Sequence, residues 1–170
     1  MLVNPNDRLL DIGCGTAQIL DHLPHKMTYV GFDASKEYIK MATQKYIDRN
    51  AQFFAKLVTD SNIGDFEPFD LVIATSLLHH LDDEEVIHLF SLGKNFLKPN
   101  GRMITIDPCY LEENQRKLAR FIISHDRGQN VRTTHQYQKL AQKIFSNVGL
   151  HVRNDLLRIP YDHAILECKI

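Results

Sequence analysis

The stretch RLLDIGCGTA, Arg8–Ala17, decides the fold of this chain. Its apolar positions lead into two glycines spaced one residue apart, the pattern of a buried strand that ends in a tight turn, and a short helix is expected over Ala17–Leu23. Gly13 and Gly15 have no side chains to keep a ligand away, and they permit positive φ. The stretch therefore predicts a strand, a turn and a helix that together bind a nucleotide-like molecule.

Length and composition predict one domain over residues 1–170, because a chain that is 44% hydrophobic can bury one good core at this length. The 20 Lys and Arg residues nearly balance the 21 Asp and Glu residues, which argues against non-specific nucleic-acid binding. No apolar run is long enough for a membrane span and no leader precedes the first strand, so we expect a cytoplasmic protein. Cys14, Cys109 and Cys168 are expected to be free thiols, and no spacing of His, Cys, Asp or Glu predicts a metal site.

Strand and helix patterns alternate along most of the chain. After the first strand, strands are expected over Met27–Asp33, Ala51–Val58, Phe69–Thr75, Arg102–Ile106, Leu150–Ile159 and Asp162–Ile170. Helices are expected to begin after the capping residues Ser35, Asp82 and Thr133. Parallel strands need right-handed helical crossovers, so the alternation predicts an α/β fold with a doubly wound, mainly parallel sheet. Ligands bind such sheets at the carboxyl ends of the strands.

Two segments depart from this alternation. Residues 110–132 carry an amphipathic helix, expected over Leu111–Ile123, and a polar loop, which together predict an inserted helical lid. The last two strands, joined at Pro160 and Tyr161, predict an antiparallel pair that closes the sheet.

Five ordered blocks resemble the motifs of class I S-adenosylmethionine-dependent methyltransferases, most of all the small-molecule branch that includes the ubiquinone and menaquinone biosynthesis methyltransferases. They are LDIGCGT at 10–16, GFDAS at 31–35, FDLV at 69–72, LHHL at 78–81 and LKPNG at 97–101. The resemblance implies a Rossmann-like, seven-stranded sheet with an antiparallel last strand. It also implies S-adenosylmethionine as cofactor and S-adenosylhomocysteine as product.

Two carboxylates favour S-adenosylmethionine over a dinucleotide as the ligand. Asp11 lies at the mouth of the turn, where it would repel a pyrophosphate and attract a cationic amino group or sulfonium. Asp33 ends the second expected strand, where a carboxylate can accept hydrogen bonds from both ribose hydroxyls. The resemblance places the methionine amino end at Asp11 and the ribose at Asp33. The alternative is that both residues cap adjacent helices. The other predicted cofactor-binding residues are Gly13, Cys14, Gly15, Ala34, Asp60 and Thr75.

Two departures from the family pattern affect the predicted site. The carboxylate that often contacts adenine aligns with Leu57, so Asp60 either takes its place or belongs to a plain turn. Only Met1–Asp7 precede the first strand, where related enzymes usually have helices. The N-terminal helices are thus expected to be absent, and the chain is either shortened or covered there by the insert. A second subunit in a homodimer is another possible cover.

The implied chemistry is an in-line displacement at the sulfonium methyl, driven mainly by positioning of donor and acceptor. His79 and His80 end the fourth strand and are the predicted catalytic residues, because either can remove a proton from the acceptor at neutral pH. The alternative is that one of them packs against the cofactor or caps the next helix.

The acceptor is predicted to be a small molecule, and the basic residues of the insert suggest an anionic one. Arg127 and Arg132 flank the predicted lid loop, and arginine suits carboxylate or phosphate. Tyr161 is a further candidate for acceptor binding. The alternative is that these arginines are solvated or paired with Glu112, Glu113 and Asp126.

We carry three function classes forward. The leading one is a small-molecule methyltransferase. The second is an S-adenosylmethionine-binding domain without transferase activity. The third is a dinucleotide-dependent oxidoreductase.

Overall fold

A computed structural model describes residues 3–64, 66–125 and 128–170. Its strands are β1 Arg8–Ile12, β2 Thr28–Asp33, β3 Ala51–Ala55, β4 Phe69–Thr75, β5 Leu97–Tyr110, β6 Arg132–Thr133, β7 Asn147–Arg153 and β8 His163–Lys169. Its α-helices are α1 Lys36–Lys45, α2 Asp60–Ile63, α3 Asp83–Asn95, α4 Lys117–Ser124 and α5 Thr134–Gln142, and two short 3₁₀ helices are η1 Gln18–His22 and η2 Leu78–His80.

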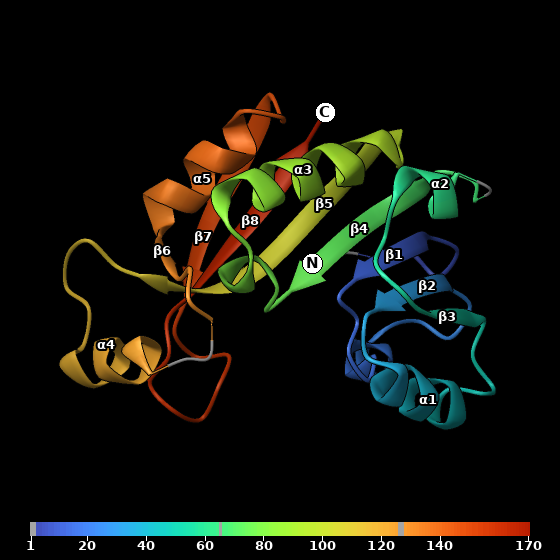
Figure 1. The fold of residues 1–170 in the computed structure, drawn as a ribbon, viewed down its shortest axis with the longest axis horizontal. Helices are drawn as coiled ribbons and strands as arrows, with labels where there is room; N and C mark the ends of the chain where they lie inside the picture. The colour runs from blue at the N-terminus through green and yellow to red at the C-terminus, as the bar shows by residue number, and fades with distance from the viewer. Residues whose placement is uncertain (1–2, 65, 126–127) are drawn as a thin grey trace.

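The sheet has the order β3-β2-β1-β4-β5-β8-β7, with β6 paired to β5 off this path (Figure 1). Strands β1 to β5 pair in parallel, and β8 runs antiparallel between β5 and β7. The predicted α/β fold with an antiparallel last strand is confirmed. The two-residue β6 is an eighth strand that the sequence did not predict.

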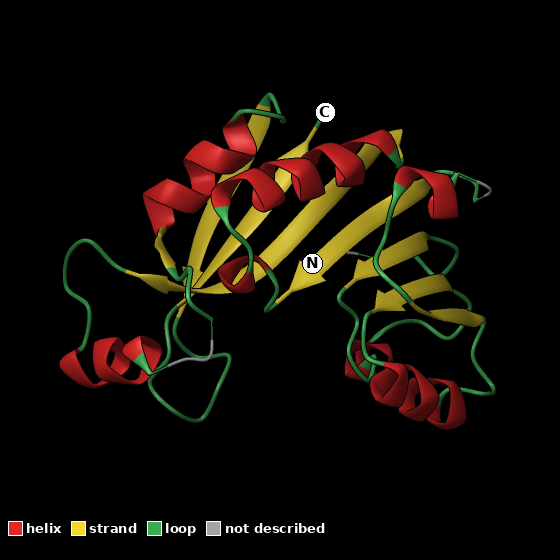
Figure 2. Ribbon diagram, in the orientation of Figure 1, coloured by secondary structure: helices red, strands yellow, loops and turns green. Residues whose placement is uncertain are grey.

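Each face of the sheet packs its own core. Leu10, Val72 and Met103 lie in a buried cluster with residues of α3 and α5, which cover one face (Figure 2). Leu9 and Leu71, next to them in sequence, face the opposite side with residues of η1 and α1. Side chains alternate across a strand, so a continuous apolar run serves both cores. Strands β1, β2, β4 and β5 are thereby packed on both faces, which fixes the positions of their carboxyl ends.

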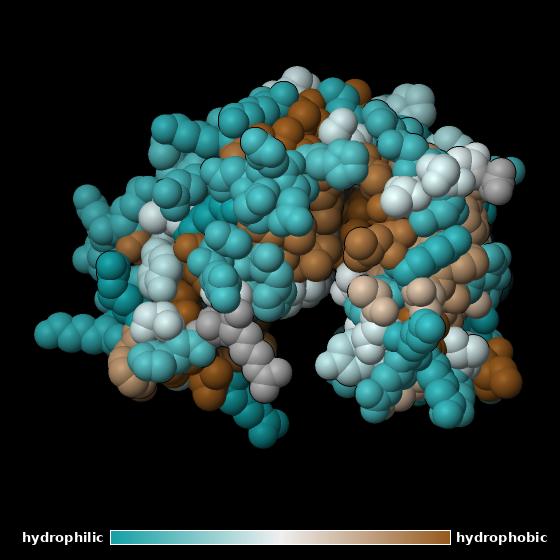
Figure 3. Space-filling view, viewed as in Figure 1, coloured by the Kyte–Doolittle hydropathy of each residue, from teal (hydrophilic) through white to brown (hydrophobic). Residues whose placement is uncertain are grey.

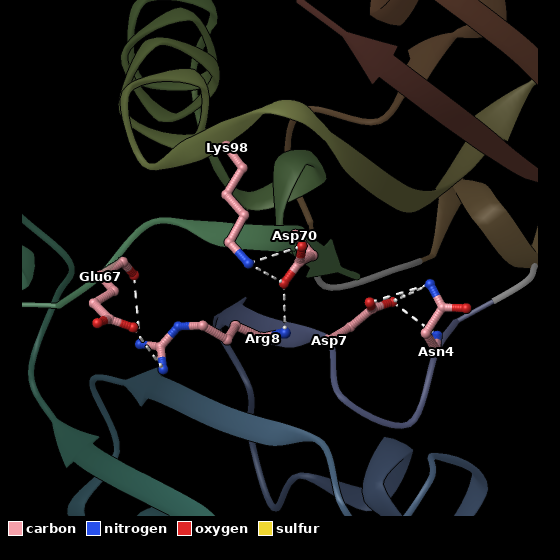
Figure 4. Close-up of polar contacts among 6 residues, drawn as sticks. All are labelled: Asn4, Asp7, Arg8, Glu67, Asp70 and Lys98. Carbon is pink, nitrogen blue, oxygen red and sulfur yellow. Dashed lines mark hydrogen bonds and ion pairs between the residues drawn. The ribbon is translucent and has the colours of Figure 1, made fainter.

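A polar cluster fixes the amino ends of β1 and β4 (Figure 4). The Arg8 backbone amide donates to Asp70 Oδ2 at 2.9 Å, and Lys98 Nζ donates to the same oxygen at 2.8 Å. This cluster holds the neighbouring strands in register at the edge opposite the predicted ligand site.

The predicted capping boxes are present, with Asp82 and Glu85 at the start of α3 and Thr133 and Gln136 at the start of α5. The predicted helix over Leu111–Ile123 is wrong in its first half. Asn114 has a left-handed backbone, φ 60°, which a right-handed helix cannot contain, and α4 begins only at Lys117. Pairing of Cys109 with Arg132 and of Tyr110 with Thr133 brings the two ends of the insert together.

The strand predicted over Leu150–Ile159 is also partly wrong. Pairing between β7 and β8 ends at Arg153 and His163, so residues 154–162 form a connecting loop. The third strand ends at Ala55 instead of Val58, which leaves Leu57 and Val58 at the carboxyl edge of the sheet.

Candidate functional site

The turn after β1 is tied to the end of β2. Gly13 and Gly15 have φ of 75° and 54°, in the left-handed region that glycine adopts without strain. The amides of Gly13 and Cys14 donate to the Phe32 carbonyl at 2.8 and 3.0 Å. The turn therefore presents its backbone beside Asp33, the next residue of β2.

Asp33 is held in place by two backbone amides. Gly15 donates to Oδ2 at 2.9 Å and Ser35 donates to Oδ1 at 2.8 Å. The residue that caps α1 is Ser35, whose hydroxyl accepts from the Tyr38 amide, so Asp33 is not merely a helix cap. Each carboxylate oxygen keeps a lone pair for a further donor, such as a hydroxyl of a ligand.

Asp11 is buried beneath the same turn. The Tyr29 hydroxyl donates to its Oδ2 at 2.6 Å. Burial raises the pKa of Asp11 to about 7, the hydrogen bond from Tyr29 opposes this rise, and the negative charge of Asp33 adds to it. A cation placed beside Asp11 would favour its ionised form, so the site is suited to an ammonium or sulfonium group.

Three cavities follow one another along the carboxyl edge of the sheet, where the space-filling view is hollowed (Figure 3). The first, of about 330 Å³, is lined by Asp33, Ala34, Leu57 and Val58, among others. The second, of about 430 Å³, is lined by Asp11, Gly13, Cys14, Gly15, Thr16, Gln18, Ile19, Thr75 and Ile106. The third, of about 710 Å³, is lined by Thr75, Ser76, His79, His80, Ile106, Pro108, Ile122, His125, Leu156, Leu157, Ile159, Tyr161 and His163.

The cavities are adjacent, because they share residues at their boundaries. Gly13 lines both the first and the second cavity. Thr75 and Ile106, which are register partners on β4 and β5, line both the second and the third. An elongated ligand in the first two cavities would therefore reach the third beside Thr75.

A buried His–Asp pair forms part of the third cavity. His79 Nδ1 lies 2.8 Å from Asp107 Oδ1, and the His79 backbone amide also donates to that oxygen at 3.2 Å. Burial raises the pKa of Asp107, while the hydrogen bond from His79 opposes the rise. His80 is exposed on the same wall, with its ring centroid 4.0 Å from that of His79.

His163 and Tyr161 complete the polar part of this cavity, with ring centroids 5.1 Å apart. Burial lowers the pKa of His163, although Asp107 and Asp162 oppose the change. Within the described part of the chain, His163 Nδ1 and Asp107 Oδ2 are buried without hydrogen-bond partners. Buried polar atoms normally have partners, so these two atoms indicate room for a bridging water or a polar ligand group.

Two predicted site residues need correction. Asp60 is the exposed first residue of α2 and does not line the first cavity, whereas Leu57 and Val58 do. Arg132 is 7% exposed, and its guanidinium donates to the carbonyls of Leu78 and Leu81 and to Asp83. These contacts use Arg132 to hold η2 and the start of α3, so it is not free to clamp an acceptor.

Arg127 lies outside the described residues. Among the described residues that line the third cavity there is no lysine or arginine, so the predicted anionic acceptor finds no support in them. The described part of the chain also contains no group of three His, Cys, Asp or Glu residues that could hold a metal ion. None of its helices is long and apolar enough to cross a membrane.

Sequence reasoning missed three features of the site. Tyr29 was not recognised as the partner of Asp11, although its register partner on β1 is Leu9, two residues before Asp11. Asp107 was not paired with His79, although Asp107 lies near the carboxyl end of β5 and His79 follows β4, the adjacent parallel strand. The apolar loop residues Leu156, Leu157 and Ile159 were assigned to a strand instead of a cavity wall.

The chain was compared with known proteins. Residues 10–103 match the family model described as a methyltransferase domain. A relative named as an uncharacterized methyltransferase of Alkaliphilus oremlandii is 23% identical over 148 residues, which cover 82% of this chain and 66% of the relative. The chain thus spans just under two thirds of the length of that curated relative.

Solved structures share the fold. A possible exported protein of Bordetella parapertussis has a TM-score of 0.75 at 17% identity, and the match covers 99% of this chain and 63% of the other. Geranyl diphosphate C-methyltransferase of Streptomyces coelicolor, solved with Mg²⁺, geranyl diphosphate and S-adenosylhomocysteine, has a TM-score of 0.68 at 16% identity, covering 98% and 74%. At these identities the similarity shows a common fold.

Proposed function

The chain belongs to the methyltransferase-domain family, and from this premise we propose that it transfers the methyl group of S-adenosylmethionine to a small-molecule acceptor. The single observation that carries the proposal is the continuous row of three cavities, because a donor, its methyl group and an acceptor need adjoining space in one line.

The first two cavities suit the parts of S-adenosylmethionine. Phe32, Leu57 and Val58 give the first an apolar wall for the adenine ring, and Asp33 accepts from the ribose hydroxyls. Asp11 and the glycine turn offer the second cavity a carboxylate and backbone groups for the methionine amino end. The predicted residues Gly13, Cys14, Gly15, Ala34 and Thr75 also line these two cavities and are proposed cofactor contacts.

S-adenosylmethionine supplies an activated methyl group on a cationic sulfur. The acceptor nucleophile forms a bond to this carbon while the carbon–sulfur bond breaks, and S-adenosylhomocysteine leaves. Thr75 and Ile106, at the boundary of the second and third cavities, mark where the two reactants meet. Most of the acceleration then comes from holding them in line.

His79 is the proposed general base. Asp107 binds Nδ1, so the neutral imidazole carries its proton on Nδ1, and Nε2 is the nitrogen that can take up a proton. Asp107 also stabilises the imidazolium that forms when Nε2 takes a proton from the acceptor molecule. His80 and Tyr161, on the same walls, are proposed to contact the acceptor.

The insert is proposed to close the third cavity, since Ile122 of α4 and His125 line it. The C-terminal part of the insert is attached to His79, the proposed base, because the Asn130 amide donates to the His79 carbonyl at 3.0 Å. Movement of α4 would therefore open the cavity at the side away from His79.

A labelled-methyl assay with a metabolite extract tests the proposal. The protein is incubated with S-adenosylmethionine labelled on the methyl group and with a small-molecule extract, and the products are separated. Label in a small molecule is expected with the unaltered protein and is expected to disappear with His79→Asn. Cofactor binding without any transfer would instead favour the binding-domain alternative.

A further inference from the structure

Apolar side chains of two separate segments are exposed around the third cavity. On α4, Leu118 is 58% exposed and Phe121 is 61% exposed. In the loop of residues 154–162, Leu156, Leu157 and Ile159 are also exposed while lining the cavity. These five residues are here called the apolar rim, and Figure 3 shows apolar side chains gathered near α4 at the lower left.

The orientation of α4 keeps its part of the rim in solvent. Ala119 and Ile123 are buried and fix one side of the helix against the protein. Leu118 and Phe121 are three residues apart and share another side, and Ile122, next to it, lines the cavity. The helix therefore has one apolar side packed against the protein and a second that stays largely in solvent, where Phe121 contacts the His125 ring at a centroid distance of 4.4 Å.

Positive charges flank the rim. Arg116, Lys117 and Arg158 form no ion pair with any described residue, and the Arg120 guanidinium lies 5.4 Å from the centroid of the Tyr110 ring. Of the acidic residues in the loop, Asp155 binds Arg153 at 2.6 Å and Asp162 is buried. Glu112 and Glu113 are exposed ahead of α4, so the four basic residues outnumber the exposed acidic residues that precede the helix. Apolar side chains beside basic ones are the composition that binds the interface of an anionic bilayer.

We propose that the apolar rim, with Arg116, Lys117, Arg120 and Arg158, docks on the surface of an anionic phospholipid bilayer. The apolar side chains enter the acyl boundary and the basic side chains contact lipid headgroups. Docking does not depend on the proposed function. If methyl transfer also holds, the third cavity faces the bilayer, and an acceptor dissolved in lipid reaches it without crossing water.

The experiment places a fluorescent probe in the rim. The chain contains no tryptophan, so Phe121→Trp creates a single reporter. Its matched control is Ile47→Trp, because Ile47 is 78% exposed and closely follows α1, a helix at the opposite side of the molecule from α4 (Figure 1). Each protein is mixed with vesicles of phosphatidylcholine alone or with one part in three of phosphatidylglycerol, and emission and co-sedimentation are measured.

A blue shift and co-sedimentation are expected for Phe121→Trp with anionic vesicles, weakening as salt is added, with no shift for Ile47→Trp. In the otherwise unaltered chain, Leu118→Ser with Phe121→Ser should abolish co-sedimentation. Arg116→Gln with Lys117→Gln should weaken it at least tenfold, whereas Lys36→Gln with Lys40→Gln on α1 should not. Circular dichroism checks that each variant is folded.

The proposal is overturned if the unaltered protein stays in solution with anionic vesicles at low salt. It is also overturned if both tryptophan variants shift equally. Concentration-dependent dimerisation that the two serine substitutions abolish, without vesicle binding, would assign the rim to a second copy of this chain instead.

Discussion

His79 Nδ1 lies 2.8 Å from Asp107 Oδ1, and both side chains are almost completely buried at the carboxyl ends of adjacent strands. This pair fixes the imidazole in one orientation on the wall of the third cavity. A fixed imidazole with its Nδ1 bound is the arrangement that a general base requires. The first prediction follows from this contact.

Asp107→Asn should lower kcat by about 10²-fold or more for an acceptor that must lose a proton, because the carboxylate no longer stabilises the imidazolium. The affinity for S-adenosylhomocysteine should stay within twofold, since Asp107 lines neither cofactor cavity. Steady-state kinetics and calorimetry measure the two quantities. His151→Gln, at an exposed position of β7, is the control and should change neither. Native kcat in Asp107→Asn would remove the pair from the mechanism.

Cofactor binding should depend on pH through Asp11, whose pKa burial raises to about 7. A bound ammonium group favours the ionised carboxylate, so binding below pH 7 must release a proton. The affinity for S-adenosylhomocysteine should thus fall by up to tenfold for each pH unit below 7 and level off above it. Calorimetry at pH 6 in buffers of different ionisation enthalpy measures the proton released. Asp11→Asn should bind weakly without this dependence, and equal wild-type affinity at pH 6 and pH 8 would disprove the assignment.

Asp11 should also make the folded protein less stable as pH rises. Its folded pKa of about 7 exceeds the ordinary 3.8, so the folded state holds a proton that the unfolded state loses between these values. The stabilising contribution is complete below pH 3.8 and is lost as pH rises through 7. In urea unfolding, the free energy of unfolding of Asp11→Asn relative to that of the wild type should rise by roughly 2–3 kcal/mol between pH 5 and pH 8. A constant difference between the two proteins at both pH values would contradict the raised pKa.

Arg132 should stabilise the folded protein and should not bind the acceptor. Arg132→Met leaves the carbonyls of Leu78 and Leu81 without their buried donor and should cost about 3–5 kcal/mol in free energy of unfolding. Arg116→Met, at an exposed position before α4, should change stability by less than about 0.5 kcal/mol. Urea denaturation of both variants provides the test, and similar midpoints would show that the contacts of Arg132 contribute little.

Gly128 should be needed for the position of His79. A Cβ atom built on Gly128 would overlap the His79 imidazole and approach its carbonyl. Gly128→Ala should therefore lower turnover without weakening cofactor binding. Gly149→Ala is the matched control, because a Cβ there meets its nearest neighbour at 3.7 Å, an ordinary contact. Equal turnover of the two variants would show that the loop adjusts without moving His79.

The fold was predictable from sequence where local signals agreed with the global arrangement. Apolar runs such as β4, with glycine turns and capping boxes between them, predicted the mainly parallel sheet and its antiparallel end. The predicted bounds were wrong where the backbone departs from the structure that the apolar pattern favours. Asn114 interrupts an amphipathic stretch with a left-handed backbone, and β7 ends at Arg153 although apolar residues continue beyond it.

The candidate site was predictable only in part, for a related reason. Asp11, Asp33 and the two glycines lie in one local motif, so sequence spacing brought them together. Asp107 and His79 meet through the pairing of β4 and β5, which no local pattern encodes. Arg132 looked available because two of its partners are backbone carbonyls 51 and 54 positions away, and the sequence does not indicate which carbonyls accept hydrogen bonds.

The most direct test of the central claim is a calorimetric titration of S-adenosylhomocysteine into the wild type and Asp33→Ala, with NAD as a competitor. One molecule per chain should bind to the wild type, NAD should not compete, and Asp33→Ala should lose at least tenfold in affinity, because charge-assisted hydrogen bonds to the ribose are removed. Unchanged affinity in Asp33→Ala, or displacement by NAD, would contradict the proposal that this cleft holds a methyl donor.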